Sequence, residues 1–290
     1  MTILFCKNAH WENILHKVKN ADLFFSQRFA GVFPGSSLFL ISLPDEGVGI
    51  FPFLSQDGAI HSFRYGGILT DRQYPGAQEA INGQLKELCK SSSLRRVIIR
   101  VHPFMPVYAA GKMVKKEPFV YIDLEQGPRT IKKGISHGHL TCIKKAAQSG
   151  LTVQYSAKGA YLKIFLEFYS RLIMKKTGKN TDIDHFRRFY LCLKDDMTFV
   201  IVKDNGATVA VSMLLKNNKS AFLAYGGMSK AGYEKFAKHL MIYQLMFDLK
   251  KDGMQKLVLG TGHEPYDPIY RFKRGFTDKD NYILTYEKKY

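Results

Sequence analysis

The sequence lacks the long apolar segments and the leader pattern of membrane-spanning and secreted proteins. Its apolar runs, such as "FLISL" at Phe39–Leu43, are much shorter than the roughly 20 residues of a transmembrane helix. The N-terminal residues do not show the basic, apolar and small-residue order of a secretory signal. We therefore expect a cytoplasmic protein, either free or bound peripherally at the inner face of the membrane.

Cysteine is scarce and unpaired along the chain. The cysteines are far apart and form no CxxC pair: Cys6, Cys89, Cys142 and Cys192. The sequence thus predicts neither a disulfide framework nor a zinc knuckle, and we interpret these residues as small buried or half-buried thiols. The segment "SHGH" offers His137 and His139 without a nearby third ligand, so we expect no metal site and no tightly bound cofactor.

Acidic residues are few relative to basic ones. The chain has 43 Lys and Arg against 25 Asp and Glu, a net charge of +18, which attracts phosphates, nucleic acid or anionic lipid headgroups. The net positive charge predicts that the partner is anionic, but it does not identify the partner. Any single basic cluster, such as "TIKKG" or "MKKTGK", is by itself typical of a solvated surface.

The sequence does contain an internal repeat. With 46% hydrophobic and 13% aromatic residues over 290 positions, we expect two compact domains. The segments Ser37–Gly67 and Thr198–Gly227 both have the pattern strand, turn, strand, turn, strand, and both end in Tyr-Gly-Gly. This indicates a duplicated fold.

Each copy continues with a helix and a further strand. A helix over 77–89 and a strand over 95–101 follow the first copy, and an almost wholly apolar helix over 232–250 and a strand over 255–260 follow the second. Helices are also predicted before the sheets, at 21–29, around 161–172 and after the cap-like "NTDID" at 180–184.

The repeated Tyr-Gly-Gly triplet predicts a glycine-rich turn between a strand and a helix. Such a turn exposes backbone N–H groups at the helix N-terminus, which favour a phosphate or an oxyanion, and glycine lets a ligand approach the backbone closely. Since the triplet occurs twice in register, it indicates a shared architecture more strongly than two ligand sites.

The order of these elements resembles the GNAT acyltransferase fold, and their duplication resembles the FemAB family. Five segments, spread in order over nearly the whole chain, carry the resemblance: "YGGILTD", "LTCIKKAAQSGLTV", "AYGGMS", "KKDGMQKLVLGTG" and "YRFKRGF". The resemblance implies an α/β protein of two tandem GNAT-like domains, with mixed sheets flanked by helices. It divides the chain into a first, acceptor-side lobe over 1–150, a second, donor-side lobe over 151–270, and a segment over 271–290 that packs back on the first lobe.

The chain also departs from the family pattern. Between Leu151 and Tyr290 there is no room for the long helical arm of many FemAB enzymes, and "IKKA" stands where "IRKA" is commoner. The segment "LGTGHEPYDP" replaces a tryptophan-containing strand end. These departures leave two classes of acyl donor open.

The resemblance implies an acyltransferase that forms an amide. The expected reaction moves an aminoacyl group from aminoacyl-tRNA to an amine of an anionic cell-envelope or nucleotide-activated precursor, as in peptidoglycan synthesis, free or lipid-linked at the membrane surface. An acyl-CoA-dependent N-acyltransferase of an amino sugar or small amine is the alternative, and a non-catalytic basic module that binds RNA or lipid is a third. The sequence contains no GxSxG elbow and no Walker motif, which favours direct attack without an acyl-enzyme.

Lys273 in "FKRGF" is the strongest candidate for a catalytic residue. A positive charge between two aromatic residues is partly desolvated, which strengthens its field on an oxyanion or phosphate. The resemblance to the lysine of the family's FK element likewise implies a role in binding or in stabilising the transition state. His263, with Glu264, is a candidate acid or base near Lys273, and Asp71 is a candidate to orient or deprotonate the incoming ammonium.

The remaining candidates are binding residues. The resemblance implies that the second Tyr-Gly-Gly turn and its surroundings bind the donor: Tyr225, Gly226, Gly227, Ser229 and Phe272. Basic and first-lobe residues are candidates for the acceptor and its phosphates: Arg64, Tyr65, Gly66, Lys132, Lys144 and Arg271. Lys132 and Lys144 lie near the expected link between the lobes, where a ligand groove or solvated linker charge would both fit.

Overall fold

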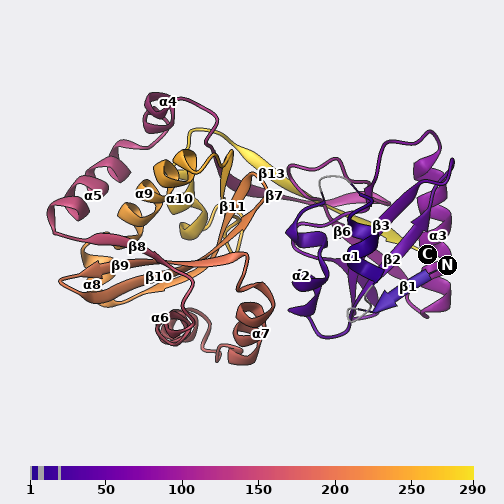
Figure 1. Ribbon diagram of the computed structural model, residues 1–290, viewed down its shortest axis with the longest axis horizontal. Coiled ribbons are helices and arrows are strands. Elements are labelled where there is room, and N and C mark those ends of the chain that lie inside the picture. The colour runs from indigo at the N-terminus through magenta and orange to yellow at the C-terminus, as the bar shows by residue number, and fades with distance from the viewer. Residues whose placement is uncertain (1, 6–9, 19–20) are drawn as a thin grey trace. The chain divides into compact units, whose positions relative to one another are not determined.

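The computed structural model describes residues 2–5, 10–18 and 21–290 (Figure 1). The chain divides into two compact units, Met1–Glu117 with Tyr282–Tyr290, and Pro118–Asn281. Cys6 lies outside the described residues, whereas Cys89 is buried and Cys142 and Cys192 are half-buried. Of the helices in the described part of the chain, none has both the length and the apolar character needed to cross a bilayer.

The first unit is an antiparallel meander followed by a helix and a parallel strand. Its elements are β1 (Thr2–Phe5), α1 (His10–Leu15), the 3-10 helix η1 (Leu23–Phe25), α2 (Gln27–Gly31), β2 (Ser36–Ser42), β3 (Val48–Gln56), β4 (Ala59–Ser62), β5 (Leu69–Thr70), α3 (Ala77–Ser91), β6 (Arg96–Arg100) and β13 (Asn281–Lys289). The strand order is β1-β2-β3-β4-β6-β13, with β5 beside β3. β4 and β6 run parallel, as a crossover through α3 requires.

The predicted apolar stripe of α3 covers one face of this sheet. Ala77, Ile81, Leu85 and Leu88 are all buried. They pack against inward-facing residues of β2, β3, β4 and β6, in which alternate side chains point to the core. The helix prediction from its 3.6-residue period is confirmed.

Gly83 interrupts α3 on its solvent side. It is exposed, and a Cβ added there would have nothing within 4 Å. Alanine loses less backbone entropy in a helix than glycine, so Gly83→Ala should stabilise the protein by about 0.5–1 kcal/mol. A higher urea midpoint with an unchanged slope is the expected result, and a lower midpoint would contradict this placement.

The second unit repeats the same plan. Its elements are α4 (Pro128–Lys133), α5 (His137–Gln148), β8 (Thr152–Ser156), α6 (Ala160–Thr177), α7 (Ile183–Leu193), β9 (Met197–Asp204), β10 (Ala207–Asn217), β11 (Ser220–Met228), α8 (Lys230–Glu234), α9 (Ala237–Lys251), β12 (Lys256–Gly260) and α10 (Pro268–Arg274). β7 (Lys112–Asp123) brings the chain in from the first unit, and the strand order is β7-β12-β11-β10-β9-β8.

Helices cover both faces of the second sheet. α5, α9 and α10 lie on one face, and α6 and α7 lie on the other (Figure 1). Successive side chains of β9 point to opposite faces of the sheet. Val200 and Val202 belong to the core under α9, whereas the ring of Phe199 contacts Tyr161 of α6 and Tyr190 of α7. The duplicated α/β fold predicted from the sequence is confirmed.

The boundaries of the units differ from the expected ones. The sequence predicts an end of the first lobe at residue 150, whereas the compact units divide between Glu117 and Pro118. Residues 118–150 belong to the second unit because α4 and α5 bury Ile131 and Ile143 in its core. The expected C-terminal segment is also divided, since α10 lies in the second unit and β13 pairs antiparallel with β6 of the first.

The predicted glycine-rich turns before the helices are wrong in both units. Tyr225, Gly226 and Gly227 lie inside β11, where pairing with β10 continues to Met228. In the first unit, Gly66 forms a parallel bridge to Val101. The predicted helix over 232–250 is also divided, because Phe236, with φ of 57°, separates α8 from α9.

Candidate active site

The parallel strands β11 and β12 separate part of the way along the second sheet. They pair at Ser220–Phe222 with Lys256–Val258. Beyond that point β12 pairs with β7 through Gly260, and β11 pairs with β10 up to Met228. Within residues 220–260, all of which are described, pairing between the two strands ends at Phe222 and Val258. We call the space between their diverging ends the wedge.

Both strands carry an irregularity where the wedge begins. In β11 the register with β10 shifts between Met213 and Leu214, so that Ala224 is an extra residue. In β12 the register with β7 shifts between Val258 and Gly260. Bulges bend a strand and leave a residue out of the ladder. The backbone edges of the wedge can therefore hydrogen-bond to an extended ligand.

The equivalent strands of the first unit stay joined. β4 and β6 pair in parallel at Ala59–His61, and the Ser62 hydroxyl then accepts a hydrogen bond from the Arg100 N–H at 2.8 Å. Gly66 continues the connection, because its N–H donates to Arg100 O at 3.0 Å and its carbonyl accepts from the His102 N–H at 2.8 Å. Where the second unit opens a wedge, the first unit thus has a closed ladder.

Two lysines lie at the wedge of the second unit. Lys273, on α10, donates a hydrogen bond from Nζ to Thr261 O, at 2.7 Å, directly after β12. Lys238, on α9, donates to the hydroxyl of Ser212 on β10. Ser212 and Gly226 are cross-strand partners, and a Cβ on Gly226 would overlap both Lys238 Nζ and Ser212 Oγ.

The two ammonium groups influence each other. Burial lowers the pKa of Lys238 to about 7, and the positive charge of Lys273 acts in the same direction. A neutral amine and an ammonium can therefore coexist at this site near neutral pH. That combination can take up a proton and also stabilise a negative charge.

Two histidines and two phenylalanines form a cluster of rings on the elements that carry the lysines and on α5. His139 Nε2 donates to Phe272 O at 2.8 Å, and its ring lies 4.7 Å from that of His239. Burial lowers the pKa of His139, and the same cause, with a contribution from His139, lowers that of His239 to about 4. Both rings are thus neutral at pH 7. They hold α5, α9 and α10 together through edge contacts with Phe272 and Phe276.

Of the predicted catalytic residues, Lys273 lies at the wedge. His263 follows β12 in an exposed loop, where its backbone N–H donates to the Asp267 carboxylate that caps α10. Asp71 belongs to the first unit and accepts hydrogen bonds from the Tyr74 hydroxyl at 2.6 and 2.7 Å. Partial burial acts to raise the pKa of Asp71, but the bonds from Tyr74 and backbone N–H groups lower it overall, which makes this carboxylate a weak base.

The predicted donor residues divide between the wedge and the packing behind it. Gly226 lies under Lys238, and the ring of Phe272 packs against both histidines. Tyr225 packs edge-on against Tyr169, Phe186 and Phe189 of α6 and α7: this is an aromatic cluster on the opposite side of the sheet from α9. Ser229 caps the short helix α8 by accepting the Gly232 N–H at 3.1 Å.

The predicted acceptor residues are spread over both units. Tyr65 is buried against Phe24 and His102, and exposed Arg64 lies over its ring. Lys132 and Lys144 are exposed on α4 and α5, within the second unit. Arg271 is exposed on α10, two residues before Lys273. These positions stay predictions.

Lys238 and Ser212 were missed by the sequence reasoning. The available signal was one lysine near the start of an otherwise apolar helix, in "FAKHLMIYQLM". The ring of His139, at which the sequence predicts no metal site, is hydrogen-bonded to Phe272 O. In the described part of the chain, no group of three metal-ligating side chains occurs.

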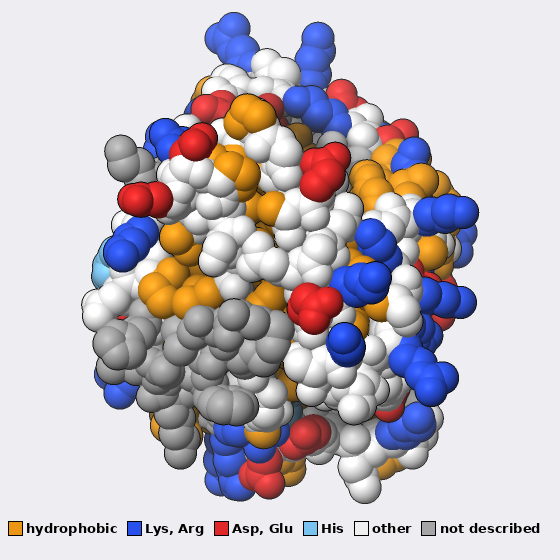
Figure 2. Space-filling view, turned by 90° about the vertical axis from the view of Figure 1, so that its right-hand side faces the viewer, with side chains coloured by type: hydrophobic (Ala, Val, Ile, Leu, Met, Phe, Trp, Pro, Cys, Tyr) orange, Lys and Arg blue, Asp and Glu red, His pale blue; other side chains and the backbone are white. Residues whose placement is uncertain are grey.

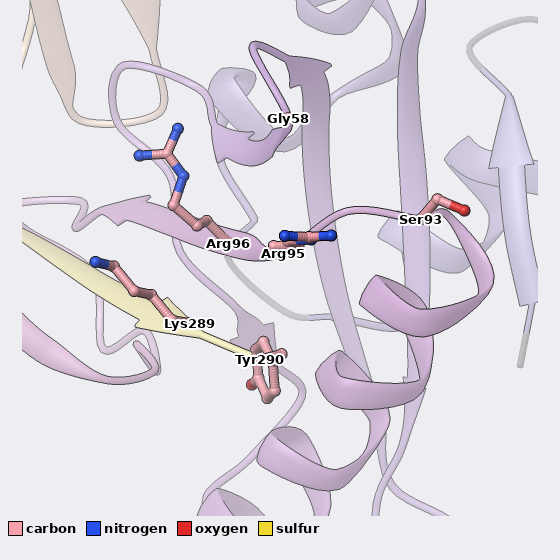
Figure 3. A pocket seen from close by; sticks show the side chains of 6 residues that line it. All are labelled: Gly58, Ser93, Arg95, Arg96, Lys289 and Tyr290. Atoms are coloured by element: carbon pink, nitrogen blue, oxygen red, sulfur yellow. The ribbon is translucent and has the colours of Figure 1, made fainter.

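The first unit contains an open cavity of about 490 Å³ lined by basic residues (Figure 3). The side chains of Arg95, Arg96 and Lys289 point in different directions, and Arg96 donates to Asp57 O. Figure 2 shows Lys and Arg side chains gathered along the right-hand edge of one face. Because the cavity's cations do not converge, the wedge of the second unit is the better candidate for chemistry.

Comparisons with known proteins agree with this fold. Residues 140–268 match the family model described as an acetyltransferase (GNAT) domain. The fold is similar to that of FemX, with a TM-score of 0.66 and 14% identity over 99% of this chain and 97% of that chain. It is similar to L-PGS from Bacillus licheniformis, with a TM-score of 0.63 and 13% identity over 98% and 92% of the two chains. A tandem GNAT protein from the clavulanic acid biosynthesis pathway gives a TM-score of 0.54 and 10% identity over 88% and 84%.

A search of curated proteins finds no significant match. The matched domain and the fold define the class: this protein is an acyltransferase of the GNAT fold. With its duplicated architecture, it is similar in fold to FemX and to the tandem GNAT protein. It is thus an enzyme rather than the non-catalytic binding module considered above.

Proposed function

We propose that the second unit transfers an aminoacyl group from aminoacyl-tRNA, bound along the wedge, to an amine of an anionic acceptor. The observation that supports this most directly is the position of the Lys273 ammonium beside the diverging ends of β11 and β12. An extended acyl ester can pair with the open strand edges, while the ammonium faces the negative charge that develops on the carbonyl oxygen.

The reaction proceeds by direct attack. The acceptor nitrogen forms a bond to the acyl carbon, and the ester C–O bond breaks as the tetrahedral intermediate collapses. Lys273 stabilises the oxyanion of that intermediate. Acyl-CoA would use the same wedge with a C–S bond in place of C–O, and it is the second candidate donor. We place the reaction in the cytoplasm, where both donors occur, with an acceptor that is free or lipid-linked at the inner membrane face.

The net charge favours tRNA over CoA. A chain with 43 basic residues against 25 acidic ones attracts a long polyanion, and each phosphate that is neutralised releases counterions. CoA carries far fewer phosphates and would make fewer electrostatic contacts with the basic surface of the protein. The resemblance of "YRFKRGF" to the FemAB closing element supports the same donor.

Binding and turnover separate the two donors. Bulk tRNA should raise the unfolding temperature and CoA should not, and the tRNA effect should fall steeply as salt rises. Turnover is then measured with radiolabelled bulk aminoacyl-tRNA or acetyl-CoA, and with glucosamine or a UDP-linked muropeptide as the amine. Stabilisation by CoA alone, with acetyl transfer to the amine, would overturn the tRNA assignment. Absence of turnover with every pair would contradict the proposed function.

A further inference from the structure

The ammonium group of Lys238 is packed against protein atoms, whereas that of a typical lysine is surrounded by water. Its ammonium lies against Ser212, which is fully buried, and Nζ is 3.8 Å from Met241 Sδ. It also fills the space that the absent side chain of Gly226 leaves above β11. α9, β10 and β11 thus hold the amine of Lys238 at the edge of the wedge, over Gly226.

The groups that face Lys238 do not neutralise it. Among the described residues, the charge that acts on Lys238 is the ammonium of Lys273 on α10. β10 and β11 contribute the hydroxyl of Ser212 and the backbone of Gly226. Next to Lys238 on α9, His239 is neutral at pH 7, as is its partner His139 on α5. Two neighbouring ammonium groups repel each other, so the more enclosed one loses its proton first.

We propose that Lys238 accepts the proton of the attacking amine, and that Ser212 orients it. This inference rests on the proposed function. As the C–N bond forms, the nitrogen passes a proton to the neutral Nζ of Lys238. As the C–O bond of the ester breaks, the Lys238 ammonium returns that proton to the leaving oxygen. Lys273 stays protonated throughout, so one lysine moves the proton while the other stabilises the oxyanion.

The protonation state of Lys238 can be read without turnover. In protein labelled with ¹³C at lysine Cε, one resonance should titrate near pH 7 and be absent from Lys238→Gln, while exposed lysines titrate near 10.4. Lys251→Ala, at an exposed position of the same helix, should leave the low-pH resonance in place. A Lys238 resonance that titrates above about pH 9.5 would overturn the proposal.

Activity distinguishes a proton acceptor from a simple charge. Lys238→Met should lower kcat/KM about 10²- to 10⁴-fold at pH 8 and remove the rise of kcat/KM with pH near 7. Lys238→Arg keeps a positive charge but cannot release a proton, so it should not restore activity. Restoration by arginine would overturn the proposal, provided that thermal melting shows both variants folded. If the wild type turns over no donor, the proposed function fails while the NMR titration still tests the state of Lys238.

Discussion

Replacing Lys273 with methionine should lower kcat/KM by a factor of about 10²–10³ while the protein remains folded. Removal of one preorganised donor to a developing oxyanion has this typical effect. Methionine keeps the unbranched shape of the side chain and removes the hydrogen bond from Nζ to Thr261 O. We therefore expect the loss to appear mainly in kcat, measured with the donor and amine that the wild type uses.

The control for this prediction is Lys251→Ala, which removes one positive charge from an exposed position on α9. It should keep wild-type kcat and show only a weaker salt dependence of tRNA binding. Full activity of Lys273→Met would contradict the role of Lys273. Equal losses in both variants would mean that net charge, rather than the wedge, controls transfer.

Loss of the Lys273 charge should also change the neighbouring lysine. The ammonium of Lys273 lowers the pKa of Lys238, so its removal raises that pKa above about 7. The rising limb of the pH profile should then move to higher pH, because the neutral fraction of Lys238 appears later. A limb that stays in place in the residual activity of Lys273→Met would show that the two lysines are not coupled.

The fold was accessible from the sequence because its signals are local. The apolar stripe of α3 and the alternation of the meander strands depend only on the 3.6- and 2-residue periods. Because the same order of elements occurs twice, the prediction for each unit supports the prediction for the other. Lys273 is a candidate for a similar reason, since its aromatic neighbours are adjacent in sequence, and its catalytic role stays a prediction.

The pairing of β7 and β13 and the position of Lys238 could not be predicted, because they depend on contacts between segments that are distant in sequence. β7 leaves the first unit and pairs with β12, and β13 returns from the second unit to pair with β6. No periodic pattern specifies which sheet an amphipathic strand joins. Lys238 and Ser212 are likewise brought together by packing of α9 on β10 and β11, and a lysine in an apolar helix gives only a weak signal by itself.

The two adjacent glycines of β11 should respond differently to alanine. At Gly227 a Cβ would lie 2.7 Å from the backbone of Phe168 and Tyr169, where α6 packs on the strand. The helix must move, so Gly227→Ala should lower the free energy of unfolding by about 1–3 kcal/mol. Urea denaturation measures this, with Gly83→Ala as the control in which the same methyl group should stabilise.

At Gly226 the added Cβ meets the ends of two side chains, Lys238 and Ser212, rather than a backbone. Side-chain ends can rotate away, so Gly226→Ala should cost less stability than Gly227→Ala. The displaced lysine can no longer hold its position at the wedge, and kcat/KM should fall by about tenfold or more, since a misplacement of about 1 Å can cost 10²-fold. The opposite ranking, with Gly226→Ala the less stable and Gly227→Ala the less active, would contradict the placement of the wedge on the lysine side of β11.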